Sequence, residues 1–210
     1  MAKKNVTNVG SPENDAKDLI ESGMPYTVEV EFAGTSDLLF HAWSVSEVEA
    51  KANAAKGSKE KKTDNPESMV YRNEKGVICI PAEYFRQSLI KASKSHQDPR
   101  SPRKSMKDLM TSIIFATEEL HPIIGQNGKE QKEWEFEDRR RVQIKMAGVT
   151  RTRPGFRKNW KCTVRFQCLA PNYLSPDKLL QLFNEAGMFC GVGDFRPTFG
   201  RYNVTSFKVL

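Results

Sequence analysis

The chain has 210 residues, a formal net charge of +7 and 10% aromatic residues. A chain of this length most simply forms one domain with a single core, and its basic, aromatic composition favours an acidic polymer as partner over a small acidic molecule. No apolar stretch approaches the ~20 residues that a membrane span needs, and the N-terminus lacks the apolar core of a signal peptide, so we expect a cytoplasmic protein that contacts no membrane.

The N-terminal part of the chain predicts a mobile arm followed by a strand. Residues 1–24 are polar without a sustained apolar period, so the folded domain is expected to span residues 25–210. From Tyr26 to Phe32, apolar and acidic residues alternate, which is typical of a strand with one buried face. His41 has no histidine or other plausible partner beside it in the sequence and is expected to be structural or exposed.

Residues 44–67 form a long polar insertion. Their apolar content falls to alanines and two valines among many lysines and glutamates. A connection of this length inside a compact domain is usually disordered or functional. The insertion is therefore either a disordered, solvated loop or a basic finger that folds on a partner.

A hairpin and two helices are predicted next. Residues 70–80 place two apolar runs on either side of a Gly-containing turn, which is typical of a hairpin. Pro81 suits the first turn of a helix whose apolar residues recur at helical spacing up to Ala92. After a basic connector over residues 99–104, the apolar spacing between residues 106 and 114 predicts a second helix.

The strongest charge contrast in the chain comes after these helices. Four acidic residues between 133 and 138 are followed by three consecutive arginines at 139–141. Alternation then predicts strands over residues 142–146 and 161–169, joined by an arginine-rich loop over residues 147–160. The loop has no acidic residue between its cations, which favours an arm that follows phosphates over a merely solvated surface hairpin.

A last helix leads into a Gly-rich stretch. Ser175 and Pro176 predict the start of the helix, and the Gly-rich stretch spans residues 187–202. Gly191 and Gly193 tolerate positive φ and have no Cβ, so they can expose amide groups to an anion. Arginines and phenylalanines of the same stretch offer paired donors and flat rings for bases. The alternative is a corner between helix and strand, in which glycines make the turn and aromatic residues fill the core.

Together these elements predict an α+β fold. Strands that alternate with helices in this proportion suggest an antiparallel or mixed sheet with helices on one face, as in a ferredoxin-like core or an RNA-recognition-motif-like core. The four cysteines are widely spaced in apolar contexts, which indicates free buried thiols instead of disulfides or a zinc site. No catalytic constellation or metal-ligand spacing is recognisable, and we expect no cofactor.

Two stretches carry a family resemblance. Gly76 to Ala92 reads as a strand, an Ile-Pro step and a helix with a basic residue just inside it, and residues 191–202 form the Gly-rich loop. Both resemble motifs of the repeat-associated mysterious protein superfamily of CRISPR systems, and within it the backbone subunits of the Cas-seven type. The chain also resembles a group of tailed-phage proteins that share residues 34–36, Leu38-Leu39 and the Gly-rich stretch, and such a protein would act in the host cytoplasm.

The resemblance implies an architecture and a partner. It implies a ferredoxin-like palm, a thumb formed by residues 44–67, and a groove to which residues 147–160 contribute. It also implies subunits that stack head-to-tail as a homo-oligomer along a single strand, usually of RNA.

Our first hypothesis is a non-enzymatic protein that binds single-stranded nucleic acid, RNA in preference to DNA. Cations would hold phosphates and aromatic rings would stack on bases. The residues predicted to bind nucleic acid are Arg86, Arg139, Arg140, Arg141, Arg151, Arg153, Phe156, Arg157, Lys158, Trp160, Gly191, Gly193, Phe195, Arg196, Phe199 and Arg201.

Two alternatives stay open. The chain could be a phage interaction protein, an assembly or anti-defence component that copies the surface of a CRISPR subunit and binds a CRISPR or phage protein complex. It could also be a metal-dependent ribonuclease, because Asp64-Asn65-Pro66 is similar to a triplet in the backbone subunits that cut RNA. For this triplet, a solvated turn is the simpler interpretation.

Overall fold

The computed structural model describes residues 23–55, 58, 64–144 and 147–210. The predicted N-terminal arm therefore falls almost wholly outside the described residues. No helix in the described part of the chain is long and apolar enough to cross a membrane. All four cysteines lie within it, and each is buried with a free thiol, as their apolar contexts predicted.

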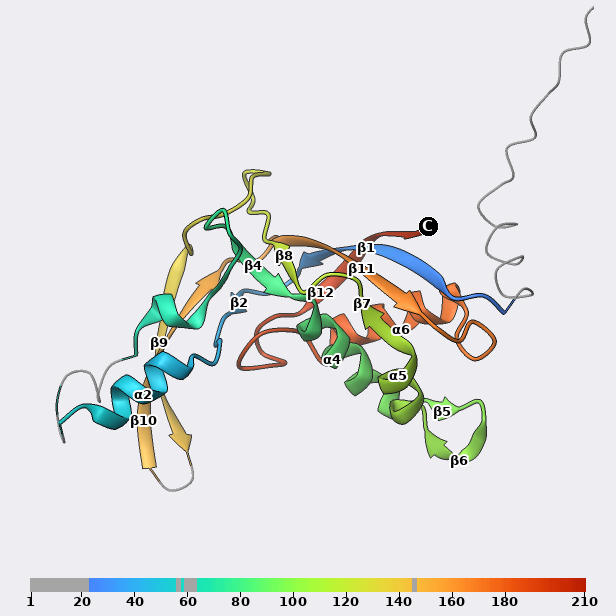
Figure 1. Ribbon diagram of the computed structural model, residues 1–210, viewed down its shortest axis with the longest axis horizontal. Helices are drawn as coiled ribbons and strands as arrows, with labels where there is room; N and C mark the ends of the chain where they lie inside the picture. The colour runs from blue at the N-terminus through green and yellow to red at the C-terminus, as the bar shows by residue number, and fades with distance from the viewer. Residues whose placement is uncertain (1–22, 56–57, 59–63, 145–146) are drawn as a thin grey trace, which may run out of the picture.

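The described residues form an arch (Figure 1). A sheet runs along the top, and two legs point down from it. One leg contains a long β-hairpin and helix α2 (Val45–Asn53), and the other contains helices α4 (Ala82–Ala92) and α5 (Lys107–Ile113). The loop that leads from the last helix to the last strand lies on the underside of the arch, between these legs.

A four-stranded antiparallel sheet in the order β12-β1-β11-β7 forms the top of the arch. Its strands are β1 (Tyr26–Gly34), β7 (Ile114–Ala116), β11 (Lys161–Cys168) and β12 (Tyr202–Val209). Helix α4 lies in sequence between β1 and β7, and helix α6 (Pro176–Phe189) lies between β11 and β12. This succession of elements, with this strand order, is the ferredoxin-like arrangement, so the predicted α+β fold class is confirmed.

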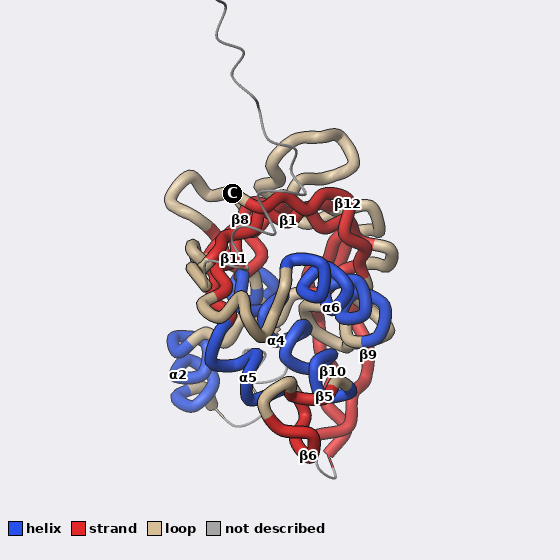
Figure 2. The backbone as a smooth tube through the Cα atoms, turned by 90° about the vertical axis from the view of Figure 1, so that its right-hand side faces the viewer, coloured by secondary structure: helices blue, strands red, loops and turns tan. Residues whose placement is uncertain are grey.

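Alternating burial along the central strands decides which face of the sheet carries the core. In β11, every second residue from Cys162 to Cys168 is buried and the residues between them are exposed, as the sequence alternation predicted. Helices α4 and α6 lie on the buried side of the sheet (Figure 2). There Phe32 of β1 stacks on Phe85 of α4, with ring centroids 4.1 Å apart, and meets Phe183 of α6 edge-on at 5.4 Å. The core therefore fills the space between sheet and helices.

The first leg is built on a three-stranded sheet in the order β2-β10-β9. Its strands are β2 (Leu38–Leu39), β9 (Phe136–Ile144) and β10 (Ala147–Phe156). The prediction of a loop over residues 147–160 is therefore wrong, because most of this segment is strand β10, antiparallel to β9. Its alternating threonines and arginines suit a strand, since each residue type then occupies one face.

The remaining strands form two small sheets. Their strands are β3 (Tyr71–Arg72), β4 (Ile78–Pro81), β5 (Gln97–Asp98), β6 (Ser101–Ser105) and β8 (Leu120–Pro122). Strands β3 and β4 are the predicted hairpin, and β8 pairs with the other edge of β4. The predicted basic connector is mostly the β5–β6 hairpin, whose turn is closed by Asp98 accepting from the backbone amide of Arg100 at 2.9 Å. A 3-10 turn, η2 (Ser93–Ser95), precedes it.

The polar insertion contains helix α2 and a 3-10 turn, η1 (Pro66–Met69); its positions 56–57 and 59–63 lie outside the described residues. Ser44 caps α2 by accepting from the Glu47 amide at 3.4 Å, and Lys51 pairs with Glu47 one turn later at 3.3 Å. The described part of the insertion therefore contains a helix and a 3-10 turn.

Candidate functional site

The Gly-rich stretch forms a loop on the underside of the arch, between the two legs (Figure 1). Its backbone runs beside the start of strand β2. The Asp194 amide donates to the Leu39 carbonyl at 2.9 Å, and the Gly200 amide donates to the Asp37 carbonyl at 2.7 Å. Gly193 has a φ of +75°, and a Cβ there would lie 2.5 Å from the Leu39 carbonyl oxygen. Glycine is thus required at this position because two backbones approach each other closely.

The two ends of the Gly-rich loop have structural roles, a turn at one end and a core residue at the other. Gly191 follows helix α6, and its amide donates to the Ala186 carbonyl at 2.9 Å. Because this donor is occupied, the prediction that the Gly191 amide binds an anion is wrong. At the other end Tyr202 is fully buried, and its ring meets Phe32 edge-on at 5.0 Å. At these positions the alternative interpretation is correct: glycine makes the turn and an aromatic residue fills the core.

Two contacts join the middle of the loop to the β9–β10 hairpin. Arg153 of β10 is buried and pairs through its Nε with the carboxylate of Asp194. Arg140 of β9 lies over the rings of Phe195 and Phe199, with its guanidinium carbon 4.8 Å and 5.0 Å from the two ring centres. Phe195 is 39% exposed and has a φ of 56°, which is rare for an aromatic residue. The loop therefore presents a fixed, exposed ring with two arginines behind it.

Strand geometry divides the arginines that the sequence groups together. In the β9–β10 register, Arg140 lies opposite Arg151 and Asp138 lies opposite Arg153, so these four residues share one face of the hairpin. Arg139 and Arg141 alternate with Arg140 and project from the other face. The three consecutive arginines at 139–141 therefore do not share one face of the hairpin.

Acidic partners neutralise most of the predicted arginines. Arg140 pairs with Asp138, Arg153 pairs with Asp194, and Arg157 pairs with Asp37 at 2.9 Å, while the adjacent Lys158 is exposed. The burial of Asp194 would raise its pKa, but a backbone hydrogen bond from Phe195 and the ion pair with Arg153 bring the pKa below its ordinary value. Asp194 therefore stays ionised near neutral pH. These ion pairs reduce the charge that the β9–β10 hairpin can offer to phosphates.

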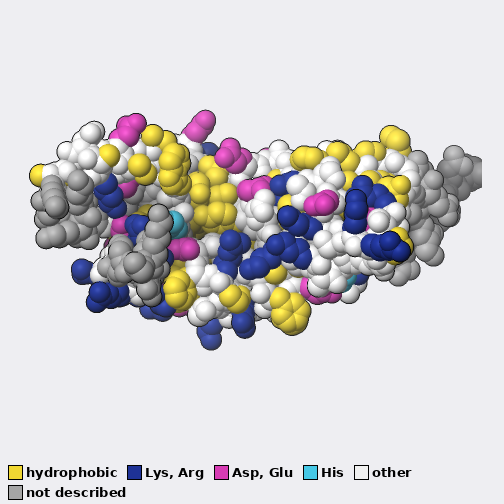
Figure 3. Space-filling model, turned by 90° about the horizontal axis from the view of Figure 1, so that it is seen from below, with side chains coloured by type: hydrophobic (Ala, Val, Ile, Leu, Met, Phe, Trp, Pro, Cys, Tyr) yellow, Lys and Arg dark blue, Asp and Glu magenta, His cyan; other side chains and the backbone are white. Residues whose placement is uncertain are grey.

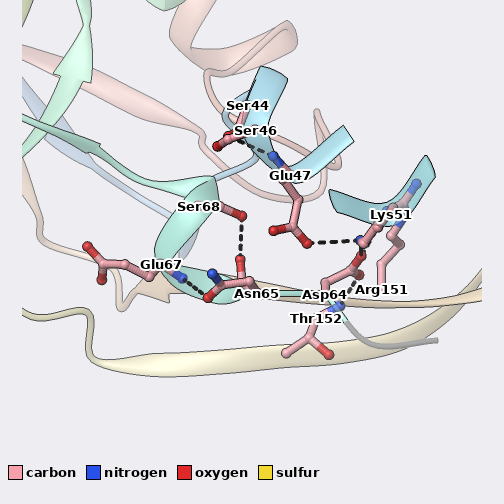
Figure 4. Close-up of polar contacts among 10 residues, drawn as sticks. All are labelled: Ser44, Ser46, Glu47, Lys51, Asp64, Asn65, Glu67, Ser68, Arg151 and Thr152. Carbon is pink, nitrogen blue, oxygen red and sulfur yellow. Dashed lines mark hydrogen bonds and ion pairs between the residues drawn. The ribbon is translucent and has the colours of Figure 1, made fainter. Parts of the chain in front are cut away.

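Asp64 is the centre of a further set of ion pairs (Figure 4). One carboxylate oxygen accepts from Lys51 and from Arg151, both at 2.9 Å, and the other accepts from the Thr152 amide at 3.1 Å. Burial alone would raise the pKa of Asp64, but the bonds from Lys51 and Thr152 and the charge of Arg151 lower it. With its side chain only 4% exposed, Asp64 fastens the insertion to β10. Both of its oxygens accept from these donors, which favours a structural role for Asp64 over the nuclease interpretation.

Three predicted contact residues are part of the framework. Phe156 is fully buried, and Trp160 is buried with its Nε1 donating to the Ser36 carbonyl at 3.0 Å, so neither ring can stack on a base. Arg86 donates to the carbonyls of Ile114 at 2.7 Å and Thr111 at 2.6 Å, which ties α4 to the end of α5. The prediction that Phe156 and Trp160 stack on bases is wrong, because both rings are buried in the core. Arg86 uses most of its hydrogen-bond donors for contacts within the protein.

Exposed cations gather on the underside. Figure 3 shows Lys and Arg side chains in a row along the middle of this face. Lys91, Lys94 and Arg196 are exposed, and all three act on Cys190: burial raises the pKa of this thiol, and the three positive charges oppose the rise. Within the described residues, none of these cations has an acidic side chain at ion-pair distance. Arg201 is also exposed, and its Nε donates to the Pro197 carbonyl at 2.9 Å.

Two hollows of about 320 Å³ each adjoin on the underside and share His41 as a wall. The side chains that line the first, called here the loop cavity, are His41, Glu83, Tyr84, Gln87, Asp194 and Arg196. The second, called here the α2 cavity, is lined by residues on both sides of the start of the insertion, including Trp43 and Lys51, and by Arg151. Burial lowers the pKa of His41 below its ordinary value, so this imidazole is neutral at pH 7.

Sequence reasoning missed most residues of these hollows, including Glu83 and Asp194 of the loop cavity. Tyr84 is partly buried on α4 and packs against the core, and Gln87 of the same helix is exposed. Nothing in the sequence distinguishes them from the other residues of the helix. Trp43 is 74% exposed at the start of the insertion. A large aromatic residue that ends an apolar run and begins a polar segment was a signal that could have identified it.

Comparisons with known proteins give a distant likeness in fold. No family model matches the sequence, and no curated protein does. The fold is similar to that of a chain in the cryo-EM structure of the type III-B Cmr-beta bound to cognate target RNA, with a TM-score of 0.48 and 8% sequence identity. The match covers 94% of this chain and 65% of that one. We therefore argue function from the geometry of the site alone.

Proposed function

We propose that the underside of the arch binds single-stranded nucleic acid, RNA in preference to DNA, without catalysing a reaction. The observation that carries this proposal is the exposed ring of Phe195. Arg140 and Arg153 lie behind the ring, with guanidinium carbons 4.8 Å and 5.8 Å from its centre, and the exposed Arg196 follows it directly. A rigid aromatic platform beside a free cation is the arrangement that holds a base and its phosphate.

A single strand of nucleic acid on this face would contact the protein on both sides of Phe195. Three cations lie on one side: Lys91 at the end of α4, Lys94 in η2 and Arg196 in the loop. Among the described residues, no acidic side chain forms an ion pair with them. On the other side, beyond His41, the exposed indole of Trp43 offers a second flat surface. Alternation of cations with aromatic rings suits single strands, because every base has a face that can stack. Arg139 and Arg141 remain exposed on the other face of the hairpin, where they could reach a longer strand.

The open face of the main sheet is a poorer candidate. On β1 and β11, its residues form ion pairs between neighbouring strands: Glu29 with Arg165 at 2.8 Å, and Glu31 with Lys161 at 3.3 Å. The outward-facing positions of these two fully described strands carry no aromatic ring. RNA-recognition motifs bind bases on aromatic residues of this face. We therefore propose that the nucleic acid binds on the underside of the arch.

Fluorescence anisotropy with a labelled single-stranded RNA tests the proposal. Phe195→Ala should weaken binding about tenfold, because loss of one stacked base is worth about 1–3 kcal/mol. Arg196→Ala should weaken it and also reduce its salt dependence. The matched controls are Tyr173→Ala, an exposed aromatic residue on the connection to α6, and Lys129→Ala, an exposed cation on another loop. Equal affinities for the Phe195 and Tyr173 variants would contradict the proposed site.

A second candidate is protein binding through α2. The helix buries none of its residues, and Trp43, Val45 and Val48 are 74%, 52% and 50% exposed. An apolar patch on a helix that contributes nothing to the core favours a protein contact, with a second copy of the chain or with a CRISPR or phage protein. Light scattering of the protein and of a Trp43→Ser/Val48→Ser variant tests the first case. A monomer in both excludes a homo-oligomer that assembles through this patch.

A further inference from the structure

Hydrogen-bond acceptors dominate the loop cavity. Glu83 and Asp194 supply carboxylates, and Gln87 supplies an amide. Both carboxylates are held in place: Glu83 accepts from the Gln87 amide at 2.5 Å and from Arg86 at 3.2 Å, and Asp194 accepts from Arg153. Fixed carboxylates attract N–H donors and repel phosphate oxygens. The cavity therefore suits a neutral group that carries amino hydrogens better than it suits an anion.

The other walls fit a flat ring with a charged tail. Tyr84 contributes an aromatic wall, and its ring is set edge-on against Tyr71 with centroids 5.9 Å apart. Arg196 contributes an exposed cation that can remain with a phosphate outside. A volume of about 320 Å³ is at the small end of ligand sites, so it limits the occupant to a compact group. An aromatic wall, fixed acceptors and an external cation together match one nucleotide with its base inserted.

We propose that the loop cavity receives one unstacked base of the bound strand and favours bases with an exocyclic amino group, which are adenine, cytosine and guanine, over uracil. This inference rests on the proposed function, because it requires a strand along the underside. Adenine and cytosine present amino donors to Glu83 and Asp194. Where adenine and cytosine have the amino group, uracil has a carbonyl oxygen, which would face a carboxylate oxygen without a hydrogen between them, so uracil keeps only its N3–H as a donor.

Binding of short homopolymers gives the test. Anisotropy titrations would compare oligoadenylate, oligocytidylate and oligouridylate of equal length at one salt concentration. We expect oligoadenylate or oligocytidylate to bind at least about fivefold more tightly than oligouridylate, since one well-formed base contact discriminates by about that factor or more. Glu83→Gln, which replaces an acceptor by an amide of the same shape, should bring this ratio close to one. Oligouridylate affinity itself should stay the same or improve.

The controls separate failure of the pocket from failure of the interface. Glu74→Gln makes the same change at an exposed turn and should preserve the base preference. Gln87→Ala is a second variant in the cavity and should also reduce the preference, in case Glu83→Gln disturbs α4. Equal binding of all three homopolymers by the unaltered protein would overturn the base pocket while leaving the proposed function intact. A base preference that persists in both cavity variants would also overturn the base pocket and leave the proposed function intact. Absence of binding to any of the homopolymers would overturn the proposed function as well.

Discussion

Replacement of Asp64 by asparagine should release helix α2 from the hairpin. The helix buries no residue of its own, so its attachment depends on the hydrogen bonds that Asp64 accepts from Lys51, Arg151 and the Thr152 amide. Charge-assisted bonds of this kind are worth about 1.5–3 kcal/mol each. Lys51 and Arg151 are each 26% exposed and regain hydration when Asp64 is neutralised. The net loss is therefore about 2–3 kcal/mol, well below the sum of the separate bonds.

Amide hydrogen exchange measures the loss of local stability in helix α2 itself. A loss of 2–3 kcal/mol in the free energy of local opening corresponds to exchange about 30- to 150-fold faster for the α2 amides. Strand β11 should exchange as before, because its protection depends on the main sheet. Glu49→Gln, at an exposed position of the same helix, is the matched control. If the α2 amides exchange equally fast in the Asp64→Asn protein and in the unaltered one, Asp64 is not what holds the insertion.

Three further predictions concern backbone geometry, acid sensitivity and catalysis. Gly200→Ala should lower the melting temperature more than Gly76→Ala. The φ angles at the two sites are similar, +75° and +73°, but a Cβ at Gly200 would lie 1.7 Å from the Val192 carbonyl oxygen, whereas Gly76 faces open space. Equal decreases in melting temperature would refute the close approach at Gly200. Folding lowers the pKa values of Asp64 and Asp194, so the stability that these residues contribute is present above the ordinary Asp pKa. This stability is lost as the pH falls below about 4 towards the folded pKa values, so the urea midpoint of the unaltered protein should fall more steeply with pH than that of the Asp64→Asn/Asp194→Asn variant. Equal slopes for the two proteins would refute this. RNA incubated with the protein and Mg²⁺ should stay full length on a denaturing gel, since ion pairs engage Asp64, and cleavage abolished by Asp64→Asn would contradict that assignment.

Much of the fold could be predicted because its signals are local. The alternation in Lys161–Cys168 reports burial on one face directly, and Ser175 with Pro176 marks the start of α6. The shorter strands could not be predicted in this way. Strand β7 has three residues and directly follows α5, so its apolar residues read as a continuation of the helix. Strand β9 begins among charged residues, and pairing with β10 determines its conformation more than its own pattern does.

The arginines were the least predictable part of the site. The sequence shows Arg151, Arg153 and Arg157 without an acid between them, yet each has an acidic partner in space. These partners are 87, 41 and 120 residues away in the sequence. Only the fold brings them together, so local charge density overestimates the positive charge of the hairpin. Phe195 and Arg196 are exposed in the middle of a loop whose ends are fixed.

The most direct test of nucleic-acid binding is a salt series of anisotropy titrations with one labelled single-stranded RNA. If Lys91, Lys94 and Arg196 contact phosphates, the logarithm of the association constant should fall linearly with the logarithm of salt concentration, with a slope of about −2. The Lys91→Ala/Lys94→Ala/Arg196→Ala variant should bind more weakly and with a slope close to zero. Absence of binding at the lowest salt concentration, or the same slope in this variant and in the unaltered protein, would contradict the assignment of the underside as the binding surface.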